Sequence, residues 1–262
     1  MATTSKQAPA TLGPRTTTST QKPLMKLAMS EVVAVNFLAP PGILKKHVPR
    51  GLELDYFEDE TYVSLVCMVV NKLGVMGIPL VPKASYISLR CYVRRSNDPL
   101  RRRGTCSIRN YVSSSTTAWL MASKLEGEFQ KMKIKRQNSG FRKKSATRPE
   151  VEYQWKVDDH WNKLRICGRS PIKNTGPKTK IGFILDHTNV YRKIKGKTSE
   201  FQVQRPAWKA WDVAEANFTC DVERLFGKPF VKPLAKRPAS VFLSSGSDAT
   251  FFKPEQVRTA TR

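Results

Sequence analysis

Arg90 is the residue whose surroundings point most directly to a chemical role. It lies in segment 86–94, where apolar residues alternate with tyrosine, serine and arginine. This alternation predicts a β-strand that is apolar on one face and aromatic and polar on the other, as in the wall of a barrel. Because arginine grips a carboxylate through two parallel hydrogen bonds, we expect a polar pocket for a small anion. The alternative is a half-buried strand with Arg90 at its rim. The residues of the polar face are Tyr86, Ser88, Arg90 and Tyr92.

Other chemistries find less support in the sequence. The histidines His47, His160 and His187 are far apart and lack the spacing of metal ligands, so no metal site is expected. Asp186 and His187 are adjacent, but neighbours on a strand point to opposite faces, which favours a structural role for His187. The sequence has no glycine-rich phosphate loop and no GxSxG motif. The catalytic residues are therefore unknown, enzymatic activity is left open, and no cofactor is expected.

The charge of the chain is unusual. Its 262 residues carry a formal net charge of +25, which attracts polyanions but does not specify a fold. Five cysteines lie in apolar runs, and their odd number and lack of a CxxC pair favour reduced thiols in a cytoplasmic protein. No apolar run approaches the ~20 residues that a membrane span needs, so we expect a soluble protein without a membrane partner. The sequence does not indicate an oligomeric state.

The N-terminal segment is poor in apolar residues. Residues 1–28 are predicted to be a disordered, basic tail that is rich in serine and threonine. Such a composition also resembles an organelle transit peptide, which is the alternative. The folded domain is expected to span residues 29–254, with a C-terminal tail at 255–262.

The elements that would position Arg90 are mainly strands joined as hairpins. Besides segment 86–94, strands are predicted at 31–38, 52–57, 61–71, 106–112, 131–136, 150–157, 161–166, 190–192, 201–205 and 214–223. Segment 181–187 is expected to lead into a strand, and helices are expected at 42–47 and 118–129. The pattern predicts an α+β protein with a single domain, mainly an antiparallel β-barrel with a few flanking helices.

Two basic segments offer a function of another class. Segment 94–103 is a predicted hairpin tip with five arginines, and segment 136–148 is a predicted basic loop. A surface protein that binds nucleic acid weakly and non-specifically through them is the alternative to a cavity protein. Aromatic residues do not interleave with these arginines, so no stacking platform is indicated there. Lys131, Lys133 and Lys135 are predicted to form a solvated strand face.

Several short runs, taken in order, resemble the YqjF-like family, a bacterial domain of unknown function whose fold is related to acetoacetate decarboxylase. The resemblance covers most of the chain, from about residue 35 to residue 254. It implies a cone-like antiparallel β-barrel with flanking helices and a central cavity. The matching runs are 35–38, 48–55, 62–66, 77–79, 89–95, 103–104, 186–187, 203–208 and 240–246.

The chain departs from the family pattern around the implied cavity. The pattern commonly reads Glu-x-Asn-x-Arg on the strand of Arg90, where Tyr86 and Ser88 stand here. Members often carry an acid in place of Asn110 and a histidine in place of Arg205. Arg90 would then need a bound anion, ordered water or a distant acid as its partner. We expect the ligand-binding residues to be Arg90, Tyr86, Ser88, Tyr92, Asn36, Asn110, Arg205 and His187.

The decarboxylase itself is known for paired lysines and a pocket glutamate. We identify no counterparts of these residues, so Schiff-base decarboxylation is not supported, and a shared fold is a weak warrant for a shared function. An inactive descendant of an enzyme family, kept for a structural role, is a third possibility.

Overall fold

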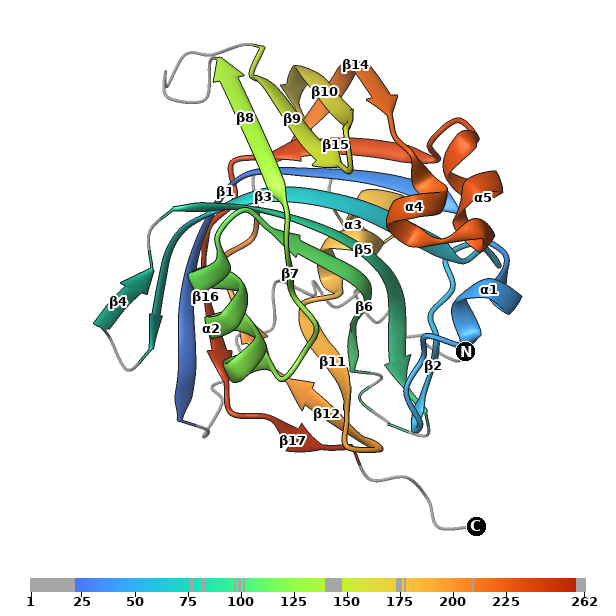
Figure 1. Cartoon of the computed structure of the whole chain (residues 1–262). Helices are drawn as coiled ribbons and strands as arrows, with labels where there is room; N and C mark the ends of the chain where they lie inside the picture. The colour runs from blue at the N-terminus through green and yellow to red at the C-terminus, as the bar shows by residue number, and fades with distance from the viewer. Residues whose placement is uncertain are drawn as a thin grey trace, which may run out of the picture.

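Strands dominate the structure, as the sequence predicts. The computed structural model describes residues 22–257 except 76–77, 82, 97, 99, 101, 140–147, 173–175, 177 and 209. The described residues form 17 strands in one sheet, together with five short α-helices and one 3-10 helix (Figure 1). The strand pairings are antiparallel except those of β6 with β7 and with β11. No described helix is long and apolar enough to cross a membrane.

The bounds of the elements are as follows. The strands are β1 (Pro23–Leu38), β2 (Leu52–Leu54), β3 (Tyr62–Val75), β4 (Ile78–Val81), β5 (Ala84–Arg95), β6 (Arg103–Val112), β7 (Gln130–Lys131), β8 (Lys133–Ser139), β9 (Glu150–Val157), β10 (His160–Pro171), β11 (Asn189–Ile194), β12 (Lys197–Phe201), β13 (Val203–Gln204), β14 (Ala210–Thr219), β15 (Ser240–Ser244), β16 (Asp248–Phe252) and β17 (Glu255–Gln256). The helices are α1 (Pro41–Lys45), α2 (Ser115–Leu125), α3 (Lys180–Asp186), α4 (Val222–Phe226), the 3-10 helix Lys228–Phe230 and α5 (Val231–Ala235).

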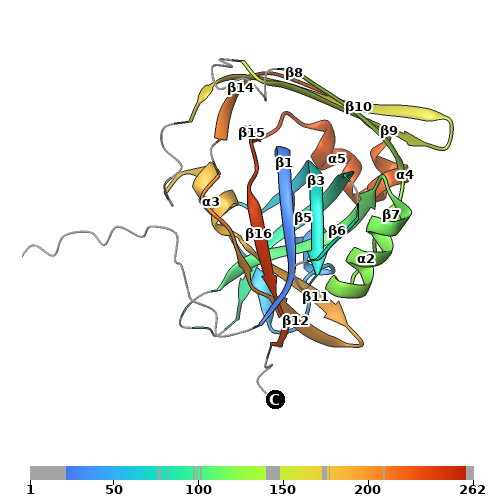
Figure 2. The same ribbon diagram turned by 90° about the vertical axis from the view of Figure 1, so that its left-hand side faces the viewer.

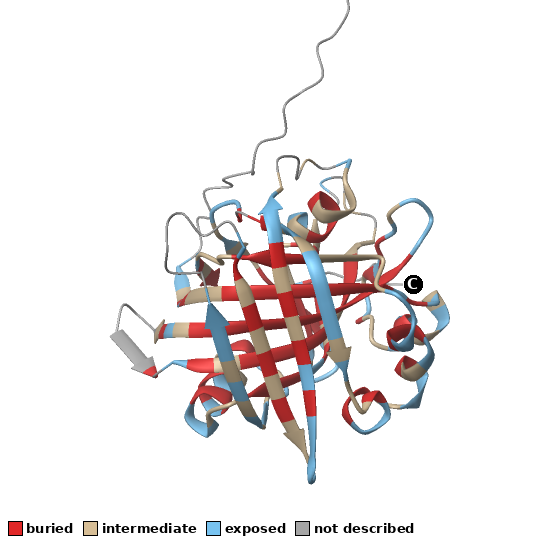
Figure 3. Cartoon of the chain, turned by 90° about the horizontal axis from the view of Figure 1, so that it is seen from above, coloured by how far each residue is buried: buried red, intermediate tan, exposed pale blue. Residues whose placement is uncertain are grey.

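Two layers of strands enclose the first hydrophobic core. In the upper layer β8, β9, β10 and β14 pair in that order, and they cross over β1, β3 and β5 below (Figures 1 and 3). The first core lies between these layers and includes Trp155 of β9, Ile166 of β10 and Leu89 of β5. Burial of each such side chain stabilises the fold by ~1.5–3 kcal/mol.

A second hydrophobic core lies beneath the sheet of β1, β3 and β5. Its side chains come from the lower faces of these strands, from β16, and from α2 and α3, which flank opposite sides of the sheet (Figure 2). The alternation along β5 divides its residues between the two cores. Ile87 and Leu89 face the first core, whereas Tyr86 and Tyr92 face the second. The predicted two-faced character of this strand is therefore confirmed.

Strands are found beyond both expected boundaries of the folded domain. β1 begins at Pro23 and not near residue 29, because Met25 and Leu27 are buried while the strand pairs with β3 and β16. At the other end β17 pairs with β12, so the fold continues past residue 254. Most of the predicted tail, residues 1–21, and residues 258–262 lie outside the described residues.

Three local predictions also differ from the structure. Segment 180–186 is a helix and not the approach to a strand, because the side chain of Thr179 accepts a hydrogen bond from the Gly182 amide and so caps the helix start. Similarly, Asp221 caps α4, so β14 ends at Thr219. The sequence predicts helix α2 at 118–129. The helix begins three residues earlier, at Ser115, because Ser114 caps it, and it ends at Leu125.

Candidate functional site

A cavity of about 100 Å³ lies within the second core, beside β5. One part of its wall is apolar and includes Met68, Leu125 and Phe242. Three arginines also line it: Arg90 from β5, Arg192 from β11 and Arg205, which follows β13. No aspartate, glutamate or lysine occurs among the described residues of the lining. The described lining of the cavity therefore carries three arginines and no carboxylate.

Arg90 is partly buried and carries an orphaned polar atom. The register of the pairing between β5 and β6 shifts between Leu89 and Arg90, so Arg90 lies at an irregularity of this pairing. Its Nε is buried and has no hydrogen-bond partner among the described residues. No described carboxylate lies within 4.0 Å of its guanidinium.

Arg205 is held against the cavity by carbonyl oxygens and an indole. Its guanidinium donates hydrogen bonds to the carbonyl oxygens of Leu185 (2.8 Å) and Pro206 (3.2 Å) and stacks on Trp208, 4.1 Å from the ring centroid. The pKa of Arg205 is lowered from 12.5 to about 10, mainly by burial and also by repulsion from Arg90, while Asp186 opposes the change. The two arginines are thus close enough to repel each other.

Arg192 is the most deeply buried of the three. Burial lowers the pKa of this arginine, and its Nε has no hydrogen-bond partner among the described residues. The guanidinium lies over Phe129, 5.2 Å from the ring centroid. Sequence reasoning missed Arg192, although a charged residue within the apolar strand pattern at 190–192 is a usable signal. It also lines a larger outer groove of about 440 Å³, together with Ser107, which lines both spaces.

Only some of the expected residues line the cavity. Those that do are Tyr86, Arg90, His187 and Arg205, whereas Asn36, Ser88, Tyr92 and Asn110 lie outside its lining. The hydroxyls of Tyr86 and Ser88 both donate to Asn110 Oδ1, at 2.6 and 3.0 Å. Asn110 Nδ2 in turn donates to the Glu128 carbonyl (3.0 Å). These polar groups therefore satisfy one another beside the cavity.

A second network of hydrogen-bonded polar side chains lies next to Arg90, since Ser64 on β3 is the cross-strand partner of Arg90. Ser64 donates to Asn36 Oδ1, Asn36 Nδ2 donates to Ser240 (3.0 Å), and the hydroxyls of Ser64 and Tyr92 lie 2.6 Å apart. Burial raises the pKa of Tyr92, while the charge of Arg90 opposes this rise. Tyr92 therefore lies within electrostatic reach of Arg90.

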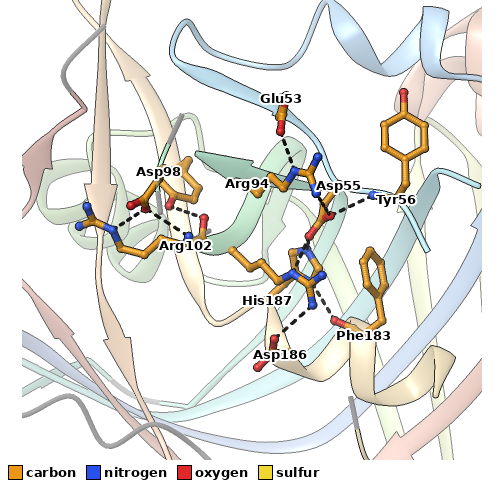
Figure 4. Close-up of polar contacts among 11 residues, drawn as sticks. Glu53, Asp55, Tyr56, Arg94, Asp98, Arg102, Phe183, Asp186 and His187 are labelled. Atoms are coloured by element: carbon orange, nitrogen blue, oxygen red, sulfur yellow. Dashed lines mark hydrogen bonds and ion pairs between the residues drawn. The ribbon is translucent and has the colours of Figure 1, made fainter. Parts of the chain in front are cut away.

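His187 is anchored on both ring nitrogens (Figure 4). Its Nδ1 lies 2.7 Å from the Phe183 carbonyl oxygen and its Nε2 lies 3.0 Å from Asp55 Oδ2. Both partners are acceptors, which requires either an imidazolium or a proton on Asp55. Because both nitrogens are engaged, His187 serves as a wall of the cavity, and its acidic partner is Asp55 and not the adjacent Asp186.

Asp55 is fully buried and joins His187 to two arginines. Its Oδ2 lies 2.8 Å from Arg103 Nε, and its Oδ1 lies 3.6 Å from Arg94. Burial acts to raise the pKa of Asp55, but the hydrogen bond and charge of His187 and the charges of the two arginines outweigh it, so the pKa is lowered. The sequence did not point to this cluster, because its members lie on β5, β6, the end of α3 and the segment after β2 (Figure 4).

The arginines of the expected nucleic-acid tip are ion-paired. Arg94 pairs with Glu53, Arg95 with Glu200, and Arg102 with Asp98, at 2.6, 2.5 and 2.9 Å. In the second basic segment, Arg136 pairs with Glu31. Residues 101 and 140–147 lie outside the described residues. The described arginines of segment 94–103 and Arg136 therefore already have carboxylate partners, whereas no described carboxylate lies within 4.0 Å of the exposed Arg148.

Comparison with known structures places the fold among acetoacetate decarboxylase-like proteins. The structure of the enduracididine biosynthesis enzyme MppR complexed with pyruvate gives a TM-score of 0.63 at 10% identity, with 95% of this chain and 96% of that chain covered. Acetoacetate decarboxylase from Legionella pneumophila gives 0.59 at 11% identity, with 98% and 94% covered. An acetoacetate decarboxylase-like enzyme from Sphingomonas wittichii gives 0.59 at 9%, with 91% and 94% covered.

At these identities the likeness concerns the fold alone. No curated protein matches the chain in sequence. A family model described as an uncharacterized conserved protein matches residues 27–248, so the chain belongs to that family, DUF2071, which is the YqjF-like family that its sequence resembles.

Proposed function

We propose that this protein binds a small carboxylate, or a similar small anion, in the cavity between Arg90 and Arg205. The observation that carries the proposal is a cavity lined by three arginines and by no described carboxylate. An unpaired buried guanidinium is costly, and a bound anion removes that cost through charge-assisted hydrogen bonds. The orphaned Nε atoms of Arg90 and Arg192 are donors that such an anion can satisfy.

The shape of the cavity fits a small organic acid. About 100 Å³ has room for several water molecules and hence for a molecule of a few heavy atoms. Apolar side chains such as Met68 and Phe242 suit a short carbon chain, while the arginines suit its carboxylate. The similarity in fold to MppR, whose structure was solved with pyruvate, makes pyruvate a sensible first probe.

The proposal includes a barrel that encloses this site. Its support is the path of strand pairings, which runs from β1 through β3, β5, β6, β11 and β12 to β17, and from β13 through β16 back to β1. In the proposed barrel, these strands would form the wall around the cavity. Free thiols at all five cysteines fit a reducing compartment, so we also place the protein in the cytoplasm.

The proposal concerns binding and includes no reaction. An imine with a keto acid needs a lysine whose amine reaches the ligand. No lysine occurs among the described residues that line the cavity. Lys193 and Lys195 line the outer groove and are absent from the lining of the cavity.

Isothermal titration calorimetry with pyruvate tests the proposal. The wild-type protein should bind pyruvate, and Arg205→Met should lose at least tenfold in affinity, because a hydrogen bond to a charged group is worth ~1.5–3 kcal/mol. Arg237→Met is the matched control, since Arg237 is exposed and lies outside the cavity lining. If acetate, pyruvate and inorganic phosphate all fail to bind, or if both variants bind as the wild type does, the proposal is wrong.

A further inference from the structure

The outer face of the upper layer carries a cluster of lysines around an exposed tryptophan. In the cross-strand register Lys133 of β8 lies opposite Lys156 of β9, which lies opposite Trp161 of β10. The next row contains Lys135, Gln154 and Lys163. Trp161 is 40% exposed, and Lys133, Lys135 and Lys163 are exposed as well (Figure 3 looks down on this layer). We call the group Lys133, Lys135, Lys156, Trp161 and Lys163 the lysine–tryptophan face.

The lysines converge on the indole of Trp161. Lys135 Nζ lies 4.6 Å from the ring centroid and Lys133 Nζ lies 5.9 Å from it. An exposed indole with two ammonium groups beside it combines an aromatic surface with local positive charge. Neighbouring strands are ~4.8 Å apart, so the other lysines of the face also lie near this ring.

Most of these lysines lack an acidic partner. Lys156 pairs with Asp159 at 3.0 Å. Within the described part of the chain, no carboxylate lies within 4.0 Å of Lys133, Lys135 or Lys163. In the turn between β9 and β10, Asp159 pairs with Lys156 and Asp158 pairs with Arg224. Three glutamates of the layer lie toward its other end, in register with Arg165 or one row beyond it: Glu150, Glu152 and Glu215.

This arrangement differs from that of the arginine-rich tip. Arg94, Arg95, Arg102 and Arg103 all pair with carboxylates, and two of their acids, Asp55 and Glu200, are fully buried. Those arginines therefore stabilise the fold. The lysine–tryptophan face has exposed cations without such partners, so a polyanion can bind there without breaking a native ion pair.

We propose that the lysine–tryptophan face binds single-stranded nucleic acid, with an unpaired base stacked on Trp161 and the phosphates on Lys133, Lys135 and Lys163. Base stacking on an aromatic ring beside a basic surface is how proteins bind single strands without reading their sequence. A duplex hides its base faces, so it can use the lysines but not the indole. An anionic membrane is disfavoured, because the face offers a single aromatic residue and no apolar patch.

Fluorescence anisotropy of a short, labelled, uridine-rich RNA with the full chain tests the proposal. Trp161→Ala should weaken binding roughly tenfold or more, because stacking of one base contributes ~1–3 kcal/mol, and Trp161→Phe should restore most of the affinity. Replacing Lys133, Lys135 and Lys163 with serine should reduce the slope of log affinity against log salt by about two units, at ~0.7 per phosphate contact. A duplex of the same sequence should bind more weakly than the single strand.

Matched variants separate this face from general basicity. Trp119 on α2 is 69% exposed, and Lys232 and Lys236 on and after α5 are exposed. Trp119→Ala and the double variant Lys232→Ser/Lys236→Ser should leave affinity and slope nearly unchanged, and thermal melting should show that every variant is folded. The proposal is overturned if the RNA does not bind, if the duplex binds equally well, or if Trp161→Ala or the triple lysine variant behaves like these controls.

Discussion

Arg90→Met should abolish anion binding without destabilising the protein. Most substitutions at a partly buried position cost about 1 kcal/mol. Arg90 is different because its buried Nε has no described partner and because its charge repels Arg205. Methionine keeps the apolar stem and removes the charge.

The magnitude follows from these two unfavourable terms. Leaving a buried donor unpaired costs ~1–3 kcal/mol. The pKa of Arg205 is lowered from 12.5 to about 10, and at ~1.4 kcal/mol per pKa unit this corresponds to about 3 kcal/mol against its charged form. Burial is the larger cause, so we assign about 1 kcal/mol to Arg90. The variant also loses the interaction with Tyr92, at ~1 kcal/mol. The ordinary cost of a substitution at a partly buried position, ~1 kcal/mol, is subtracted as well, so we expect a free energy of unfolding equal to that of the wild type or up to ~2 kcal/mol higher.

Urea denaturation with and without pyruvate measures both effects. A ligand at a hundred times its Kd stabilises a protein by ~2.7 kcal/mol, and only the wild type should gain this. Arg205→Met relieves the same repulsion between Arg90 and Arg205, and the double variant Arg90→Met/Arg205→Met can lose that repulsion only once. The double variant should therefore be less stable, by about 1 kcal/mol, than the sum of the two single effects predicts. A loss of more than ~2 kcal/mol in Arg90→Met without ligand would show that Arg90 is a structural residue and would refute the reasoning.

Three further predictions concern stability and reactivity. Cys67, Cys91 and Cys106 are buried, and burial raises the pKa of Cys91 to about 12, so a bulky thiol reagent should label at most Cys167 and Cys220 rapidly in the native protein and all five cysteines in denaturant. Gly246→Ala should destabilise the protein by about 2 kcal/mol in urea, because φ is +75° and a Cβ would clash with the Met29 carbonyl, whereas Gly42→Ala, with open space around it, should be neutral or slightly stabilising. The pKa of Asp55 is below its ordinary 3.8, so the stability that its ionised carboxylate contributes is present above pH 3.8 and is lost as the pH falls through the lowered pKa. Asp55→Asn should therefore be less stable than the wild type at pH 7, and urea denaturation should show a smaller loss of stability for it in that acid range.

Local patterns in the sequence were sufficient for most strands. The alternation at 86–94 predicted a strand with two different faces, and Ile87 and Tyr86 do pack into different cores. The hairpin of β9 and β10 followed from the same period of two. The ends of elements were less predictable, because side-chain caps such as Thr179 and Asp221 compete with the apolar pattern.

The residues of the candidate site also fall into those that the sequence predicted and those that it could not. The sequence selected Arg90 and, through the family resemblance, Arg205, and both line the cavity. It could not assign Asn36, Ser88 and Asn110 to the polar networks beside the cavity, because hydrogen-bond partners 18 to 204 residues away are not visible in local spacing.

What the sequence alone determined about this protein is its strand pattern, its large positive charge and one arginine on an aromatic face. Only the tertiary structure decided which of those charges are free. It joined Asp55 to Arg103 and His187 over 132 residues of chain, and it buried Glu200 against Arg95. It left Arg90, Arg192 and Arg205 around one cavity without an acid among its described lining. The reason is that the strength of a charge interaction depends on distance and burial, which are set when distant strands pair and not by the order of residues along the chain.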